Sequence, residues 1–318
     1  MSPEQLRILR YQLPPFGEGA RPSDEMHAFC QFYGINFTER FPALEHLVGY
    51  VDSGGFRLAL HCWRQPDAQT NLLIVHGYYD HTGLFGHLVE WGLANRCNVV
   101  VFDLPGHGLS TGAPAVIHDF SDYGRAIDAV LQRVWLPQLP LVAMAQSTGG
   151  AAIVEYARIS SGSPWPFAAT VLLAPLVRPA GWNGVRVAHT LLRSFVRSIP
   201  RTFAENTGNL QFLDFVRTDP LQCHEVPLAW VSALRRWLKE LPREDLGVGT
   251  ALIVQGDRDL TVDWRYNLEF MAQLFPGAAV EMIEGAGHQL ANETPATRAH
   301  YLNLVAGYLV ERGVFECE

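Results

Sequence analysis

The chain has 318 residues, of which 48% are hydrophobic and 18% charged, so it is long enough to bury a sizeable core. Its formal net charge of −8 argues against nucleic acid as the main partner. No run of about 18 apolar residues occurs, which argues against a transmembrane helix.

The cysteines indicate a reducing compartment. The five of them are scattered, odd in number and without a CxxC pair, which favours free thiols over a disulfide framework and offers no zinc spacing. The first residues, MSPEQLRILRYQLPPF, contain neither a sustained apolar core nor a small-residue cleavage site, so no signal peptide is predicted. A cytoplasmic protein is therefore expected.

Residues 1–45 are predicted to form an N-terminal extension that is irregular apart from one short helix over 24–33. Strands and helices alternate after it. Strands are predicted over 56–63, 71–76, 98–103, 141–145 and 168–174, and helices over 83–95, 117–135 and 148–158. Such alternation predicts a parallel sheet with helices on both faces.

The alternation breaks between residues 176 and 247, a stretch that is rich in Arg and Trp and is predicted to be mainly helical, with no clear strand. It then resumes, with strands over 251–255 and 279–283 and helices over 264–275 and 295–312. The sequence therefore predicts a doubly wound core formed by 46–175 and 248–318. A helical cap, 176–247, is inserted after the fourth parallel-type strand.

The stretch LVAMAQSTGG places Ser147 between a predicted strand and a predicted helix. A residue at the end of such a strand lies at the carboxyl edge of the sheet, where open α/β sheets bind their ligands. A tight turn there admits only small residues two positions before and after the serine, and Ala145 and Gly149 meet that condition. Ser147 would then be presented at a strained corner beside a helix N-terminus. Taken alone, the motif fits an ordinary serine N-cap equally well.

A serine nucleophile needs a base to take its proton and a group to orient that base. The last two predicted strands are followed by GDRDLTVDW and GAGHQLANE, which would face the same edge. His288 is the candidate base, and Asp259 is the candidate orienting carboxylate. Two other aspartates compete with it: Asp257 has the pattern of a turn residue, and Asp263 that of a helix N-cap.

Acyl transfer also needs two hydrogen-bond donors for the oxyanion. We predict the backbone N–H of Thr148, directly after the serine, and that of Tyr78, in the loop HGYYDHTGLF. His76 and Gly77 begin this loop, and the glycine allows a close approach of the backbone.

The same loop region raises the question of a metal, because His76, His81 and His87 lie close together in the sequence. Their spacing is irregular and no acidic partners are arranged around them. Structural histidines are therefore favoured, and neither a metal nor a cofactor is predicted.

Five motifs follow one another along the chain: HGYYDHTGLF, FDLPGHGLSTG, AQSTGG, GDRDLTV and GAGHQLANE. In this order and spacing they resemble the α/β-hydrolase superfamily. Within it they are most similar to the monoacylglycerol lipase and lysophospholipase group, often labelled serine aminopeptidase-like hydrolases. The resemblance runs from about Val48 to Gly313 and leaves the first 45 residues without a role. The GxSxG of the family is AxSxG here, which still satisfies the need for a small residue.

The resemblance implies an α/β-hydrolase fold and a serine esterase or lipase that acts on lipid-like or small acyl esters through an acyl-enzyme intermediate. Ser147 would be the nucleophile, Asp259 the acid and His288 the base, with Tyr78 and Thr148 as oxyanion donors. An aminopeptidase or amidase and a thioesterase stay open on the same triad. The contrasting hypothesis is a non-catalytic protein of this fold that binds a ligand or partner. Dehalogenases and epoxide hydrolases are disfavoured, because they place aspartate at the elbow.

The predicted cap contains ten Lys/Arg and seven Asp/Glu, a net charge of +3, whereas the rest of the chain carries −11. At helical spacing, GVRVAHTLLRSFVRSI places Arg186, Arg193 and Arg197 on one side and apolar residues on another. The sequence favours an apolar face packed on the core beneath solvated arginines. The alternative is a basic amphipathic helix that makes peripheral contact with an anionic membrane. The oligomeric state stays open.

Overall fold

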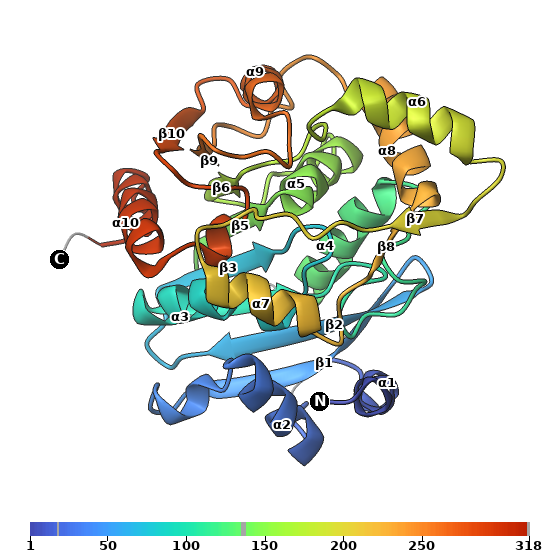
Figure 1. Cartoon of the computed structure of the whole chain (residues 1–318). Helices are drawn as coiled ribbons and strands as arrows, with labels where there is room; N and C mark the ends of the chain where they lie inside the picture. The colour runs from blue at the N-terminus through green and yellow to red at the C-terminus, as the bar shows by residue number, and fades with distance from the viewer. Residues whose placement is uncertain (18, 135–137, 317–318) are drawn as a thin grey trace.

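The computed structural model describes residues 1–17, 19–134 and 138–316 (Figure 1). An eight-stranded sheet in the order β1-β2-β4-β3-β5-β6-β9-β10 runs through the molecule. Its strands are β1 (Glu45–Ser53), β2 (Phe56–Arg64), β3 (Thr70–Val75), β4 (Cys97–Phe102), β5 (Leu141–Gln146), β6 (Ala169–Leu173), β9 (Leu252–Gly256) and β10 (Ala279–Ile283). From β4 to β10 all neighbours are parallel, and β2 is antiparallel to β1 and β4. The predicted doubly wound, mostly parallel sheet is confirmed.

Helices cover both faces of this sheet and separate two apolar cores. On one face lie α4 (Ser121–Val134), α5 (Thr148–Ile159) and α9 (Trp264–Leu274); on the other lie α3 (Gly86–Ala94) and α10 (Pro295–Glu311). Strands β3, β4, β5, β6 and β9 are buried along their whole length, which explains their continuous apolar runs. The helix predicted over 117–135 begins later, at Ser121, and residue 135 lies outside the described residues.

The first strand, β1, is absent from the prediction. It pairs with β2 in antiparallel register through the two-residue turn Gly54-Gly55, where both glycines have positive φ (57° and 90°). A two-residue turn of this kind favours glycine because a side chain there would be strained. The Gly-Gly pair between two apolar stretches was therefore an available hairpin signal.

The N-terminal extension is more ordered than the sequence predicts. Besides the predicted helix, α2 (Asp24–Tyr33), it contains α1 (Pro3–Gln12), so the description as irregular is wrong for this segment. The cause is a complete capping box: the Ser2 hydroxyl accepts from the Gln5 N–H, and the Gln5 side chain accepts from the Ser2 N–H. Both helices lie beside β1 at one end of the sheet (Figure 1).

Residues 176–247, called the cap segment from here on, connect β6 to β9. They contain α6 (Trp182–Leu192), α7 (Leu210–Thr218) and α8 (Leu228–Glu240), as the helical prediction requires. They also contain a short antiparallel pair, β7 (Ser198–Pro200) and β8 (Glu225–Pro227), so the prediction of no strand is wrong. Three residues on each side are too few to show an alternating pattern.

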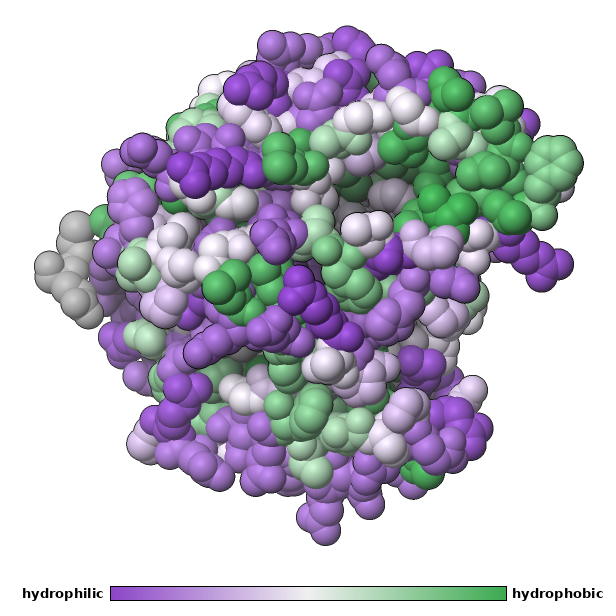
Figure 2. Space-filling view, viewed as in Figure 1, coloured by the Kyte–Doolittle hydropathy of each residue, from purple (hydrophilic) through white to green (hydrophobic). Residues whose placement is uncertain are grey.

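The apolar side of α6 faces outward instead of packing on the core, which overturns the favoured arrangement. Val187 is 62% exposed, Leu191 65% and Phe195, just past the helix, 84%. Figure 2 shows this hydrophobic surface where α6 lies in Figure 1. The buried side of the helix carries His189 instead, whose Nε2 lies 2.7 Å from the Ser232 hydroxyl of α8. The helix ends at Leu192, so it covers only the first part of the stretch 184–199 to which helical spacing was applied.

A buried ion pair joins the cap segment to the core and to the N-terminal extension. Asp219, directly after α7, accepts from His81 Nε2 (2.8 Å) and from the Tyr33 hydroxyl of α2 (2.7 Å). Burial alone would raise the pKa of Asp219, but the facing His81 and these hydrogen bonds outweigh it and lower that pKa to about 2. Burial likewise opposes protonation of His81, yet Asp219 holds its pKa above the ordinary value. We call these three side chains the cap latch.

We expect Asp219→Asn to cost about 3–5 kcal/mol of unfolding free energy, because His81 loses its buried counter-charge. The ion pair contributes its full stabilisation between the ordinary pKa of aspartate and the ordinary pKa of histidine, roughly pH 4 to 6.5. The raised pKa of His81 adds stability that disappears as pH rises through its folded value. Urea unfolding at pH 5.5 and 8.5 should therefore show the larger loss at pH 5.5. Asp214→Asn, which removes an exposed pair with Arg217, is the matched control and should change little.

Candidate active site

Ser147 occupies a sharp turn between β5 and α5. Its backbone has φ 52° and ψ −115°, a strained conformation for a residue with a side chain. Two hydrogen bonds hold it there: its N–H donates to the Leu173 carbonyl (2.9 Å), and its own carbonyl accepts from the Leu176 N–H (3.0 Å). A Cβ on Gly149 would lie 2.2 Å from the Val75 carbonyl oxygen, so the predicted close approach at this glycine is confirmed. Ala145 is fully buried in the same turn region.

The structure brings three predicted side chains together at the carboxyl edge of the sheet. The Ser147 hydroxyl lies 2.8 Å from His288 Nε2, and His288 Nδ1 lies 2.7 Å from Asp259 Oδ2. Because a carboxylate only accepts, Nδ1 donates to Asp259 and Nε2 is left to accept the serine proton. All three side chains are buried.

Asp259 is held by a set of donors that the sequence did not reveal. Its Oδ1 accepts from the N–H groups of Thr261 (2.8 Å) and Val262 (3.1 Å), and its Oδ2 also accepts from Gln255 Nε2 (3.1 Å). Burial would raise the pKa of Asp259, but His288 and these hydrogen bonds outweigh it and hold the pKa below its ordinary value. The carboxylate is therefore ionised at neutral pH.

The two competing aspartates have other partners. Asp257 accepts from the Gly285 N–H (2.7 Å) and so fixes the turn after β10. Asp263 precedes α9 and forms an ion pair with Arg178 (2.6 Å), although its side chain makes no hydrogen bond to the helix N-terminus. Neither carboxylate has a hydrogen bond to His288 among the described residues.

The predicted oxyanion donors, Tyr78 and Thr148, both line the pocket that contains Ser147. Among the residues that the structure describes, no acceptor takes a hydrogen bond from either backbone N–H. Gly77 brings the loop close, since a Cβ there would lie 3.3 Å from the Ser147 Cβ. His76 fixes the same loop: its Nδ1 donates to the Gly77 carbonyl (2.7 Å), and its Nε2 accepts from the Leu104 N–H (2.9 Å).

The three histidines noted in the sequence do not converge. Burial lowers the pKa of His76 to about 3, so it is a neutral structural side chain. His81 belongs to the cap latch, and His87 is an exposed residue of α3. Across residues 1–17, 19–134 and 138–316, the one group with metal-ligand geometry lies elsewhere, at Cys30, His46 and His61.

An apolar pocket of about 330 Å³ opens beside Ser147. The core supplies one wall and the cap segment the other, and the apolar lining residues include Leu176, Val185, Phe203, Leu213, Val226 and Trp230. The Trp230 ring of α8 stacks on the Tyr78 ring at a centroid distance of 4.0 Å. The cap segment therefore both shapes the pocket and supports the loop that presents the Tyr78 N–H.

Three polar residues of the pocket were missed in the sequence. Burial raises the pKa of Asp80 to about 6, and its Oδ1 accepts from Gln289 Nε2 (2.8 Å). Arg201, from the cap segment, lies over the Tyr79 ring with its guanidinium carbon 3.8 Å from the centroid. Asp80 precedes His81 in the motif HGYYDHTGLF, and Gln289 follows His288 in the motif GAGHQLANE. No sequence signal distinguishes Arg201 from the other arginines of the cap segment.

A family model described as "Serine aminopeptidase, S33" matches residues 66–295, which is most of the chain. The chain belongs to this family. Proteins with similar sequences include the monoglyceride lipase of Rattus norvegicus, 26% identical over 85% of this chain and 91% of the relative. The monoglyceride lipase of Homo sapiens is 28% identical over 79% of this chain and 85% of the relative.

Solved structures share the fold of this chain. A soluble variant of the monoglyceride lipase of Saccharomyces cerevisiae superposes with a TM-score of 0.72 at 17% identity, covering 88% of this chain and 97% of that one. The monoacylglycerol lipase of Paleococcus ferrophilus gives 0.65 at 18% identity, over 80% and 99%. The predicted α/β-hydrolase fold is confirmed.

Proposed function

We propose that this chain is a carboxylic-ester hydrolase that works through an acyl-enzyme intermediate, with a Ser147–His288–Asp259 triad. One observation carries the proposal: the continuous hydrogen-bonded chain from the Ser147 hydroxyl through His288 to Asp259, at the floor of an apolar pocket. Relatives that are themselves monoglyceride lipases support ester hydrolysis.

In this mechanism His288 Nε2 takes the hydroxyl proton while the Ser147 oxygen attacks the ester carbonyl. Asp259 keeps the imidazole in the required tautomer and stabilises its positive charge. The N–H groups of Tyr78 and Thr148 receive the oxyanion, and the loss of one such donor typically costs about 10²–10³-fold in rate. His288 then protonates the leaving alcohol. In the second half of the reaction, water attacks the acyl-enzyme with His288 again as the base, and the carboxylic acid is released.

The pocket supports a lipid-like acyl ester as substrate. Its lining is mainly apolar, so an acyl chain can leave water there, whereas Asp80 and Arg201 offer polar contacts. We propose that the cap segment is a lid over this pocket and that the substrate class is monoacylglycerols or similar single-chain lipid esters, as the names of the relatives suggest.

A panel of p-nitrophenyl esters of increasing chain length tests this proposal. Each methylene that enters the pocket contributes about 0.8 kcal/mol, so kcat/KM should rise by up to ~4-fold per methylene until the pocket is full. Monoacylglycerols, lysophospholipids, acyl thioesters and aminoacyl amides belong in the same panel. The proposal fails if amides are cleaved and no ester is.

The second candidate function, cleavage of an aminoacyl amide, rests on Asp80. Its Oδ2 receives no hydrogen bond from any residue within the described ranges and belongs to a pocket-lining side chain, so it could accept a substrate ammonium group. The Arg201 cation in the same pocket opposes such a ligand, which favours the ester. If the amide is the substrate, Asp80→Asn will reduce turnover of aminoacyl p-nitroanilides and spare neutral esters.

We further propose that the outward face of α6 rests on a lipid surface. The apolar side chains there are flanked by Arg186, Arg193 and Arg197, all exposed. Val185, on the same helix, lines the pocket, so one helix borders both the outward apolar surface and the pocket at Ser147. No helix among the described residues is long and apolar enough to span a bilayer.

Sedimentation with phosphatidylcholine vesicles, with and without phosphatidylglycerol, tests this contact. We expect binding to the anionic vesicles, since each basic residue near such a surface contributes about 1 kcal/mol, and salt should weaken it. Phe195→Ser should reduce binding, whereas Val280→Ser, at a 43% exposed apolar position on β10, should not. Equal and negligible binding to both vesicle types would contradict the proposal.

A further inference from the structure

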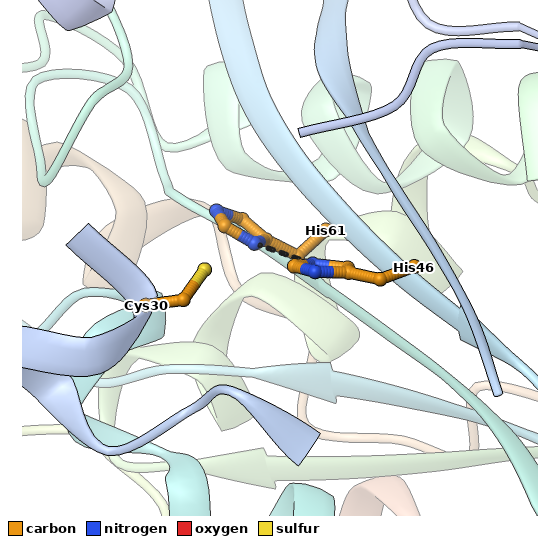
Figure 3. Close-up of side chains that lie close together, drawn as sticks. All are labelled: Cys30, His46 and His61. Carbon is orange, nitrogen blue, oxygen red and sulfur yellow. Dashed lines mark hydrogen bonds between the residues drawn. The ribbon is translucent and has the colours of Figure 1, made fainter. Parts of the chain in front are cut away.

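Cys30, His46 and His61 form a buried cluster that the proposed reaction does not use. They come from α2, β1 and β2, respectively, and none of them lines the pocket at Ser147. In the β1–β2 register His46 faces Trp63, and His61 faces Val48, so both imidazoles lie on the side of the sheet that α2 covers. Figure 3 shows the Cys30 sulfur pointing toward the His61 ring.

The ligand atoms are already close together. One nitrogen of each histidine and the Cys30 sulfur lie within 4.8 Å of one another, and His46 Nε2 is 3.1 Å from His61 Nδ1. Metal–nitrogen and metal–sulfur bonds of about 2.0 and 2.3 Å place neighbouring ligands roughly 3.5 Å apart around one ion. A movement of about 1 Å would therefore complete the site, which is within the reach of side-chain rotation.

The cluster also has unused hydrogen-bonding capacity. His61 Nε2 is buried without a partner, and within the described part of the chain the Cys30 thiol makes no hydrogen bond. Cys30 and His61 are 1% exposed and His46 is 6% exposed, so bulk water does not supply the hydrogen bonds that these groups lack. Polar groups buried in this way are costly unless something binds them.

Both imidazoles are in the form that binds metals. Burial lowers the pKa of His61 to about 4, and burial and the neighbouring His61 hold that of His46 well below its ordinary value. Both rings are therefore neutral, and each has one unprotonated nitrogen; a cation that binds both rings replaces the hydrogen bond between them. Burial raises the pKa of the Cys30 thiol to about 12, so the thiol keeps its proton until a cation displaces it.

We propose that Cys30, His46 and His61 bind one Cu⁺ ion. A thiolate with two imidazoles, and no carboxylate, suits a thiophilic cation and not Mg²⁺ or Ca²⁺. Charge selects among thiophilic cations: Cu⁺ with one thiolate is neutral, whereas Zn²⁺ would leave one positive charge in an apolar shell. That shell includes Phe29, stacked on His61, and Trp63, stacked on His46 at 4.6 Å. Binding forms three bonds to the ion and releases the thiol proton to solvent, with no electron transfer.

The test uses untagged full-length protein in which Cys223, which is less buried than Cys30, and Cys317 are both replaced by serine, so that neither thiol competes for the ion. Cu⁺ is added anaerobically with a chromophoric Cu⁺ chelator, and a parallel sample receives Zn²⁺. We expect one retained Cu⁺ per chain, a thiolate-to-copper absorption band and a thermal midpoint that rises with added Cu⁺.

Two variants should lose the ion. Cys30→Ser removes the thiolate, and His46→Phe removes a nitrogen but keeps a ring to stack on Trp63; each should weaken binding at least about 100-fold. Cys97→Ser, at another fully buried cysteine, is the matched control and should bind normally. Circular dichroism of the metal-free proteins shows whether each variant folds. The proposal is overturned if no Cu⁺ is retained, if folded His46→Phe retains it equally, or if only Zn²⁺ binds. None of these outcomes depends on ester hydrolysis.

Discussion

Replacing Ser147 by alanine is expected to remove ester hydrolysis almost completely, with kcat falling about 10⁶-fold. The loss is this large because no other group at the site can form the acyl-enzyme, and only the oxyanion donors and substrate binding would remain. A fluorophosphonate probe gives the direct measurement: the native chain should be labelled at Ser147, and the variant should not.

Ser160→Ala is the matched control for this variant. Ser160 lies at the opposite end of α5 from Ser147, so its replacement perturbs the same helix without touching the pocket. It should be labelled and should turn over esters as the native chain does. A native chain that folds but resists the probe would favour a non-catalytic ligand-binding protein of this fold.

Replacing Asp259 by asparagine is expected to lower kcat about 10⁴-fold while leaving KM nearly unchanged. The amide keeps the shape of the carboxylate, but it can donate to His288 Nδ1 and so stabilise the wrong tautomer, with the proton on Nε2. It also cannot balance the charge of the imidazolium. Steady-state kinetics on a single p-nitrophenyl ester measure both parameters.

Asp257→Asn is the matched control for Asp259→Asn. Asp257 lies in the same loop, but its carboxylate accepts from the Gly285 N–H instead of from His288. It should retain kcat within a few-fold. If Asp257→Asn or Asp263→Asn caused the large loss and Asp259→Asn did not, the orienting acid would be misassigned.

The strands of the parallel sheet and the turn at Ser147 could be predicted from the sequence, because both depend on local patterns of residues. Buried parallel strands must be apolar along their length, and loops at their carboxyl ends must face one edge, so Ser147, Asp259 and His288 could be brought together without coordinates. The requirement for a small residue at Gly149 followed from the same turn.

What the sequence did not reveal depends on contacts between distant segments. Asp219 lies 138 positions from His81, and nothing near either residue indicates their pairing. Nor does helical periodicity say which face of α6 meets the core: an apolar stripe is typical of packing, yet here His189 is buried and Phe195 exposed. The cluster of Cys30, His46 and His61 likewise forms only when α2 packs over β1 and β2.

The cap segment supports the loop of the predicted donor Tyr78 at three places: Trp230 stacks on the Tyr78 ring, Arg201 lies over the Tyr79 ring, and Asp219 pairs with His81. It is therefore not a detachable module that merely shields a finished catalytic centre. A shortened protein with residues 176–247 excised would keep the serine, histidine and aspartate in the chain, but the loop carrying the Tyr78 N–H would lose all three supports. Engineering of substrate scope should accordingly vary pocket-lining residues that do not support this loop, such as Val185 of α6, and leave Arg201 and the stretch from Asp219 to Trp230 intact.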